Sequence, residues 1–505
     1  MTGDADAIVV GSGPNGLAAA VTLAAAGLRV LVIEGAAEIG GGCRTAGLTL
    51  PGFAHDVCSA AHPLAVASPF FRRFDLAARG VRLVAPPVAF AHPLDGGRAA
   101  AVTGSVRRTA ADLGQDGERY QAMIGPLADS PDLADAVLTS MRRLPAPSAA
   151  LARFGAYAPR SAAGLTRRLR TPEARALLAG AAAHAMAPLT APLTAGVGLL
   201  LTALAHQVGW PVAAGGSASI TAAMADAVTA AGGTIETGRW VRTLAELPPA
   251  RAVLLDVTPR ALLRMAGPRL PSLYRAELAR FRYGPGACKV DFALSGPVPW
   301  ASAAARQAGT LHLGGTFEEV AAAEAAVAAG RHPDRPFVLA VQPGVVDSSR
   351  APDGRQTLWA YCHVPAGSTV DLSDRIQAQI ERFAPGFGDL VLHRSVRTAA
   401  DLAAYNPNYV GGDIGSGAQT LRQSLARPTA RWNPYRTPLR GVYLCSSSTP
   451  PGPGVHGRCG ELAALSALRD RFGVTGQPAI GPDRLPGNTR PVDGVGAGDQ
   501  SGGTC

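Results

Sequence analysis

Three glycines near the start of the chain have the spacing of a phosphate-binding loop. Gly11, Gly13 and Gly16 form the pattern G-x-G-x-x-G, with Pro14 and Asn15 between the last two glycines. The first glycine permits a tight turn, the second lets the backbone approach a pyrophosphate, and the third allows a helix to pack closely on a strand. The N-terminus of that helix adds free N–H groups and a partial positive charge. The pattern predicts a dinucleotide site; the alternative is a glycine-rich turn without a ligand.

An acidic residue follows this loop at a distance typical of dinucleotide-binding proteins. Glu34 lies 18 residues after Gly16 and ends the apolar run at 29–33. A carboxylate there accepts hydrogen bonds from ribose hydroxyls and repels a 2′-phosphate, which disfavours NADP. The runs at 7–10 and 29–33 are predicted to be buried parallel strands, and residues 17–26 the helix between them. This is a β-α-β unit with a right-handed crossover.

A second glycine cluster favours FAD over NAD. Gly40, Gly41 and Gly42 precede Arg44 and Thr45 in the segment GGGCRT. This cluster resembles the GG motif that follows the first motif in flavoproteins of the glutathione-reductase-like class. Arg44 is placed to meet the pyrophosphate, and the glycines allow the backbone to approach it. The alternative is a simple loop with a salt-bridged arginine.

Four further segments match a known family: GWP with the glycine-rich stretch at 209–241, GACKVDFAL at 286–294, NPNYVGG at 406–412 and YLCSSSTPPGPGVHGRCG at 443–460. With these segments, the chain up to about residue 472 resembles the phytoene desaturase-related flavoproteins, within the flavin amine oxidase-like superfamily. The resemblance implies FAD as the cofactor, with the backbone near Val241 on the adenine side. It also implies cofactor contacts in the closing motif, where Ser446 stands in place of a frequent glycine: Ser446, Gly452, Gly454, Val455 and His456.

These observations predict the fold class. We expect an α/β protein with a Rossmann-like, glutathione-reductase-like FAD-binding domain, an interleaved α+β substrate domain and a helical insert. The FAD-binding domain is predicted at 1–68, 206–285 and 431–472. The substrate domain is predicted at 69–205, where helices dominate, and at 286–430. A loop between helices is expected at 144–148, and a disordered tail at 473–505.

Two side chains are candidates for catalysis. Lys289 is the only lysine among 47 basic residues; in amine oxidase-like relatives a lysine approaches the flavin N5 through water, and the alternative is an ion pair with Asp291. His456 is a candidate for proton transfer, because the closing motif places it near the flavin. Three other histidines have apolar neighbours typical of core or pocket positions: His62, His184 and His206. Two cysteines inside the flavin motifs are expected to act as small packing residues: Cys43 and Cys459.

The leading functional hypothesis is a desaturase or dehydrogenase that passes hydride from a substrate C–H bond to flavin N5, with oxygen or a quinone as the electron acceptor. The resemblance implies an apolar small-molecule substrate, a polyene or a lipid. A flavin amine oxidase is the first alternative, and Trp300, Trp359 and Tyr361 are its candidate aromatic residues. The others are a non-redox double-bond isomerase and a flavin-stabilised binding protein.

The amino-acid composition limits the kinds of molecule that the protein is expected to bind and the compartment in which it is expected to work. The 505 residues are 47% hydrophobic and 17% charged with a net charge of +10, yet no nucleic-acid-binding module accompanies the basic residues. Seven cysteines without a CxxC pair argue against a disulfide framework or a metal site, and for a reducing compartment. The N-terminus has no secretory signal pattern, and the apolar run at 195–205 is too short to span a bilayer. We expect a cytoplasmic protein, compatible with peripheral membrane contact and with a homo-oligomer.

Overall fold

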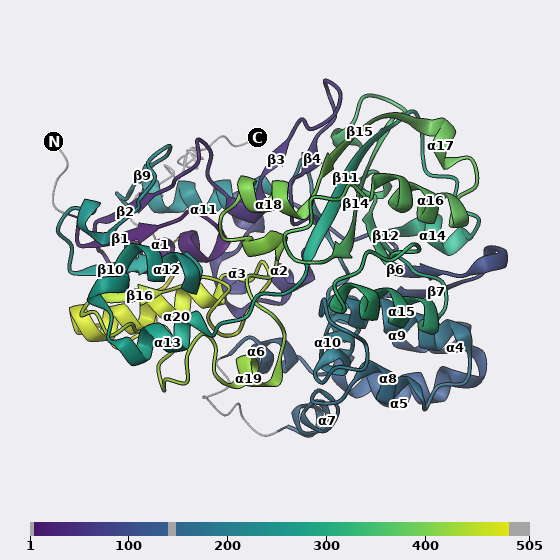
Figure 1. The fold of residues 1–505 in the computed structure, drawn as a ribbon, viewed down its shortest axis with the longest axis horizontal. Coiled ribbons are helices and arrows are strands. Elements are labelled where there is room, and N and C mark those ends of the chain that lie inside the picture. Colours follow the sequence, from purple (N-terminus) through teal and green to yellow (C-terminus); the bar gives the residue numbers. More distant parts are fainter. Residues whose placement is uncertain (1–4, 140–147, 484–505) are drawn as a thin grey trace, which may run out of the picture.

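The computed structural model describes residues 5–139 and 148–483. Its first layer is a parallel sheet with the strand order β16-β10-β1-β2-β9 (Figure 1). The strands come from distant parts of the chain: β1 (Ala7–Val10), β2 (Val30–Ile33), β9 (Thr234–Glu236), β10 (Ala252–Leu255) and β16 (Val442–Leu444). The strands predicted at 7–10 and 29–33 are therefore confirmed to within one residue. The sequence also predicts strands at the apolar runs 252–257, 441–445 and 234–241. The first two form strands to within two residues, whereas the third ends early, at Glu236.

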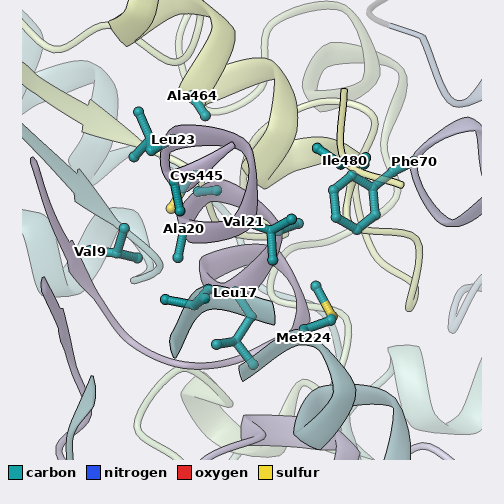
Figure 2. Close-up of a cluster of buried hydrophobic side chains, with 14 of the residues drawn as sticks. Val9, Leu17, Ala20, Val21, Leu23, Phe70, Met224, Cys445, Ala464 and Ile480 are labelled. Atoms are coloured by element: carbon teal, nitrogen blue, oxygen red, sulfur yellow. The ribbon is translucent and has the colours of Figure 1, made fainter. Parts of the chain in front are cut away.

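Helices cover both faces of this sheet because successive strand residues point to opposite sides. Val9 and Val32 pack with α1 (Pro14–Ala24), α11 (Ala218–Ala230) and α20 (Arg458–Ala467) in one core (Figure 2). Ile8 and Ile33 pack with α12 (Pro259–Ala266) and α13 (Ser272–Ala279) in another. Helix α1 starts three residues earlier than predicted, because proline is well tolerated in the first turn, where its missing N–H costs nothing.

A second, larger sheet has the order β15-β11-β14-β13-β12-β6-β7, in which only β12 and β6 run parallel. Its strands are β6 (Val88–Pro93), β7 (Ala99–Thr103), β11 (Gly286–Leu294), β12 (Ala308–Leu313), β13 (Val338–Val341), β14 (Gln356–Val364) and β15 (Val391–Arg397). One face packs on α14 (Ala303–Gln307), α16 (Ser373–Phe383) and α17 (Phe387–Leu390). The other packs in part on α15 (Phe317–Ala328) and α18 (Ala399–Tyr405).

The segment 69–205, where helices were predicted to dominate, also contains strands. It contributes β6 and β7 to the large sheet, and its β5 (Leu83–Val84) pairs with β8 (Val212–Ala213). The alanine-rich composition hid these short strands, because alanine has no preference for strands. Helix α2 (Pro63–Ala67) lies just before this segment. The rest of the segment forms the helices α3 (Pro69–Phe74), α4 (Val106–Asp112), α5 (Gly117–Ala128), α6 (Leu133–Val137), α7 (Ala149–Tyr157), α8 (Ala162–Thr166), α9 (Pro172–Ala183) and α10 (Thr194–Gln207).

Two sequence predictions fall largely outside the described residues. Of the loop expected at 144–148 only Ser148 is described, where it caps α7. The tail predicted at 473–505 is described only up to residue 483. In the described ranges no helix is long and apolar enough to cross a membrane.

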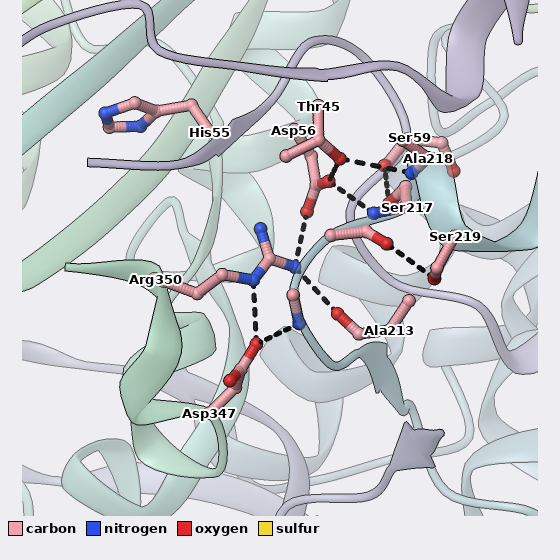
Figure 3. Close-up of polar contacts among 12 residues, drawn as sticks. Thr45, His55, Asp56, Ser59, Ala213, Ser217, Ala218, Ser219, Asp347 and Arg350 are labelled. Atoms are coloured by element: carbon pink, nitrogen blue, oxygen red, sulfur yellow. Dashed lines mark hydrogen bonds and ion pairs between the residues drawn. The ribbon is translucent and has the colours of Figure 1, made fainter. Parts of the chain in front are cut away.

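A buried ion-pair network joins the large sheet region to the loops that follow the phosphate-binding unit (Figure 3). Arg350 is 1% exposed; its Nε donates to Asp347 at 2.8 Å, and one terminal nitrogen donates to Asp56 at 3.0 Å and to the Ala213 carbonyl at 2.9 Å. Asp56 lies in β4 (His55–Asp56), which pairs with β3 (Thr45–Ala46), and it also accepts a bond from the Ser217 N–H at 2.7 Å. One guanidinium therefore holds three chain segments together.

Candidate functional site

One large cavity runs from the phosphate loop of the parallel sheet to the floor of the second sheet. Its volume is 1250 Å³, which exceeds the roughly 300–1,000 Å³ typical of a single small-ligand site. Twelve of the predicted cofactor residues line it: Gly11, Gly13, Pro14, Asn15, Glu34, Gly41, Gly42, Arg44, Val241, Ser446, Gly454 and Val455. They come from the start, middle and end of the chain, so the fold brings together what the sequence separates.

The phosphate loop has the backbone geometry that its glycines predict. Gly11 has φ +101°, in the left-handed region where glycine is favoured. A Cβ on Gly16 would lie 2.1 Å from the Gly11 carbonyl oxygen, and one on Gly13 would lie 2.8 Å from a carboxyl oxygen of Asp256. Helix α1 begins at Pro14, directly after Gly13, which has no side chain to cap the helix. The loop therefore leaves a cradle next to the N-terminus of α1, and a side chain at Gly13 would fill it. An anionic diphosphate needs such a free space to reach the N–H groups of the helix N-terminus.

The carboxylate of Glu34 lies at the rim of this cradle. One oxygen accepts bonds from the N–H and hydroxyl of Ser12 at 2.8 and 2.6 Å, and the other accepts from the Ala36 N–H at 2.9 Å. Arg44 lies 3.5 Å from Glu34 and also donates to the Ile39 carbonyl at 3.0 Å. The ion pair of Arg44, which was the alternative to a pyrophosphate contact, is therefore present. Arg44 nevertheless forms part of the cavity wall.

The other predicted cofactor residues lie behind the lining. Gly16 packs α1 on the loop, and Gly40, with φ +109°, turns the chain towards the second glycine cluster. The Thr45 hydroxyl bonds Asp56 at 2.8 Å and accepts from the Ala218 N–H at 3.1 Å, away from the cavity. Gly452 shapes the closing turn with φ +114°. These residues support the walls rather than form them.

His456 is fully buried and does not line the cavity. One ring nitrogen lies 3.1 Å from the Gly452 carbonyl, and the other accepts from the Arg458 N–H at 3.1 Å. Burial lowers the pKa of His456 to about 4, so the ring is neutral near pH 7. In this arrangement the imidazole holds the closing turn in place, and its predicted role in proton transfer stays a prediction.

Lys289 also lies behind the cavity wall. Its ammonium group pairs with Asp291, and burial lowers the pKa of the lysine and raises that of the aspartate. The Nζ atom is 5.6 Å from the ring centroid of Trp359, which lines the cavity. The predicted ion pair is therefore confirmed, whereas the predicted catalytic role of Lys289 stays a prediction.

The floor of the cavity is a face of the large sheet. Register places Lys289, Tyr361 and Leu339 in one row across β11, β14 and β13, and Asp291, Trp359, Val341 and Thr310 in the next row on the same face. The rings of Trp359 and Tyr361 meet edge to face, with centroids 5.2 Å apart. The third aromatic candidate, Trp300, is instead buried in the core, where its indole N–H bonds Gln342 at 2.9 Å.

The far end of the cavity is apolar. Its lining side chains come mostly from α6, α7 and α10 and from the residues just after α6 and α9: Val137, Leu138, Leu151, Phe154, Met186, Leu193, Val197, Leu200 and Leu201. Two histidines also line the cavity, and burial lowers the pKa of His62 to about 4 and that of His184 to about 3, so both rings are neutral. His206 lies outside the cavity and bonds Tyr120 at 2.7 Å.

The cysteines in the flavin motifs occupy different places. Cys43 lines the cavity together with Cys58, and burial raises the pKa of both thiols. Cys459 is buried behind the closing turn, with its sulfur 3.4 Å from the Thr449 and Gly452 carbonyls. Protonated, buried thiols serve as small packing groups, as expected. Within the described ranges, no cluster of three His, Cys, Asp or Glu could hold a metal ion.

Sequence reasoning missed several lining residues. Asp256 directly follows β10, beside the phosphate loop, and Tyr409 lies over the second glycine cluster, where a Cβ on Gly42 would be 2.5 Å from its hydroxyl. A signal for Asp256 was present: it ends an apolar run predicted to be a strand, and ligands of parallel sheets bind at the carboxyl ends of strands. Tyr409 lies in the motif NPNYVGG at 406–412, but the motif alone did not indicate that this side chain forms part of the wall.

The geometry of the phosphate loop and of the parallel sheet defines a Rossmann-like nucleotide-binding domain. Residues 9–74 match the family model of the NAD(P)-binding Rossmann-like domain. The chain is 28% identical over 559 aligned positions to the rat protein named pyridine nucleotide-disulfide oxidoreductase domain-containing protein 2, covering 92% of this chain and 93% of that one. It is 29% identical over 130 residues to 4,4′-diapolycopen-4-al dehydrogenase of Metabacillus indicus, covering 24% of this chain and 26% of that one.

Solved oxidase structures share the whole fold. A putrescine oxidase with bound putrescine superposes with a TM-score of 0.61 at 19% identity, covering 92% of this chain and 98% of that one. The cyclohexylamine oxidase of Brevibacterium oxydans gives a TM-score of 0.57 at 17% identity, with coverage of 92% and 99%. At this level of identity the likeness concerns the fold alone.

Proposed function

We propose that this protein is an FAD-dependent desaturase or dehydrogenase that acts on a C–H bond of an apolar substrate. One observation carries the proposal: a single cavity joins a phosphate loop with an acidic ribose partner to an apolar chamber. Its volume is large enough for a dinucleotide and a second molecule to lie in the same cavity.

The residues that would hold FAD are those that line the first half of the cavity. The phosphate loop and the N-terminus of α1 would hold the pyrophosphate, Glu34 the ribose, and Val241 the adenine side. The closing turn at Gly454 and Val455 borders the chamber, so these two residues would contact the flavin ring. When bound, FAD supplies the hydride acceptor.

The protein itself positions the substrate and keeps water away from it. The Trp359 and Tyr361 rings and the α10 side chains exclude water from the substrate, and the neutral His62 and His184 add no charge to the chamber. An apolar chamber favours a hydrocarbon-rich substrate, because the burial of apolar surface away from water lowers the free energy of binding. The name of the diapolycopenal dehydrogenase relative also supports a polyene-like substrate.

The second candidate is a flavin amine oxidase, which the edge-to-face pair Trp359–Tyr361 and the oxidase neighbours favour. Anaerobic titration separates the candidates. A desaturase bleaches the flavin absorbance when a polyene is added, whereas an amine oxidase bleaches it with an amine. An isomerase turns over only after chemical reduction of the flavin, and a binding protein neither bleaches the flavin nor turns over a substrate. Either of these two results would reject the proposed redox reaction.

The apolar chamber gives a substrate-specific prediction. We expect Val197→Asp in α10 to raise the KM for a long apolar substrate by about tenfold or more, because a buried carboxyl without a partner costs at least about 1–3 kcal/mol. The amount of bound FAD should stay the same, since Val197 lies in the apolar half of the cavity. Steady-state kinetics and flavin absorbance measure the two quantities; an unchanged KM would show that the substrate lies elsewhere.

A further inference from the structure

A carboxyl group lies where the proposed pyrophosphate site would place negative charge. Asp256 follows β10 and lines the cavity, and its Oδ2 accepts a bond from the Gly16 N–H at 2.9 Å. The same oxygen is 2.8 Å from a Cβ built on Gly13, so the carboxyl is packed directly against the phosphate loop. In the described residues the other oxygen, Oδ1, has no hydrogen-bond partner. It is free to bond a ligand.

No cation compensates this carboxyl. Among the described residues, no lysine or arginine contributes to its pKa, and Arg44 is paired with Glu34. The groups on the neighbouring elements are one acid and three neutral side chains: Glu34 after β2, Cys445 after β16, Cys459 of α20 and Asn408, whose amide donates to the Asp256 carbonyl at 2.9 Å. An ionised Asp256 would therefore repel a bound diphosphate, and no neighbouring cation would offset this repulsion.

We propose that Asp256 is a cofactor-binding residue that stays protonated in the FAD complex and donates a hydrogen bond from its second oxygen to the pyrophosphate. The inference rests on the proposed FAD site, and it specifies in addition that the Asp256 carboxyl of this site carries a proton. The chain's own carboxyl then acts as a donor, and Gly16 fixes its orientation by donating to Oδ2. A neutral donor beside a dianion removes the repulsion and adds a charge-assisted bond.

Burial supports this protonation state. It raises the pKa of Asp256 to about 7, with the Gly16 hydrogen bond opposing the shift and the charge of Glu34 adding to it. The complex then binds a proton that the free protein loses above about pH 7, so the Kd for FAD should rise by up to about tenfold per pH unit above that point. The cavity histidines do not titrate there, because the pKa values of His62 and His184 lie at about 4 and 3.

The test measures the Kd for FAD by quenching of flavin fluorescence at about pH 6 and about pH 8.5. We expect up to about 30-fold weaker binding by the wild-type apoprotein at the higher pH, since that pH lies about 1.5 units above the pKa of about 7. Asp256→Asn presents an acceptor to Gly16 and an N–H donor to the ligand at every pH, so its Kd should stay near the wild-type value at low pH and should not change with pH. The matched control Asp226→Asn, on the exposed face of α11, should keep the wild-type dependence.

A second measurement needs no ligand. Because the folded pKa lies above the ordinary value of 3.8, the folded apoprotein holds a proton that the unfolded chain has lost, and this contribution to stability disappears as the pH rises towards about 7. Asp256→Asn should remove that part of the pH dependence of Tm.

Three results would overturn the inference: a wild-type Kd that is constant with pH, an Asp256→Asn variant with the wild-type slope, or a loss of FAD binding in that variant at low pH. If FAD binds at no pH, the proposed function fails instead, so the two failures can be told apart.

Discussion

Replacing Gly16 with alanine is expected to weaken FAD binding by up to about 100-fold. The added Cβ would lie 2.1 Å from the Gly11 carbonyl oxygen and 3.0 Å from the Asp256 carboxyl. Helix α1 packs closely on the strand and loop at this point, so neither can move away without a cost in free energy. Overpacking of this kind costs about 1–3 kcal/mol, and the upper value corresponds to about 100-fold in affinity. Equilibrium titration of the apoprotein with FAD measures the loss.

The matched control is Gly104→Ala, between β7 and α4. A Cβ there meets nothing within 4 Å, and the residue is not in the left-handed region. We expect wild-type FAD affinity and a Tm near that of the wild type. If both alanine variants bind FAD like the wild type, the loop at 11–16 is not the phosphate site.

Arg350→Ala is expected to lower the free energy of unfolding by about 3–5 kcal/mol. The guanidinium is 1% exposed, and its removal leaves the buried carboxylates of Asp56 and Asp347 without their cation. Breaking a buried pair by removing one partner is far more costly than losing an exposed one, because a charge stays in a low dielectric without compensation. Denaturant unfolding, or Tm where unfolding is irreversible, measures the effect.

Arg335→Ala provides the comparison. Its side chain is 73% exposed and lies 3.6 Å from Glu319, so its loss should cost less than about 1 kcal/mol. Equal stabilities of the two variants would show that the Arg350 network does not hold the loops together. Arg350→Lys should recover only part of the loss, since one ammonium cannot replace the directed bonds to Asp347, Asp56 and the Ala213 carbonyl.

Local patterns were sufficient to predict the nucleotide-binding half of the protein. The glycine spacing, the apolar runs around it and Glu34 each specify a backbone shape, and Gly11 and Gly16 have the shapes expected. The strands β10 and β16 were also visible, because buried parallel strands are nearly continuous apolar runs.

The rest of the site depends on contacts between distant segments, which no local pattern encodes. Asp256 reaches Gly16 across 240 residues, and Asp56 reaches Arg350 across 294. The closing motif was recognised, yet the motif alone could not show that His456 turns inward to the Gly452 carbonyl rather than towards the cavity. Lys289 likewise stood out by its rarity, but the sequence could not show that its ammonium group pairs with Asp291 near the Trp359 ring, outside the cavity lining.

The absorbance spectrum of the purified protein, followed by titration of its apoform with FAD, tests the central claim most directly. The account predicts a yellow protein that binds one FAD per chain, with the flavin enclosed in the cavity between the phosphate loop and the Trp359–Tyr361 floor. A colourless protein that does not take up added FAD would contradict it.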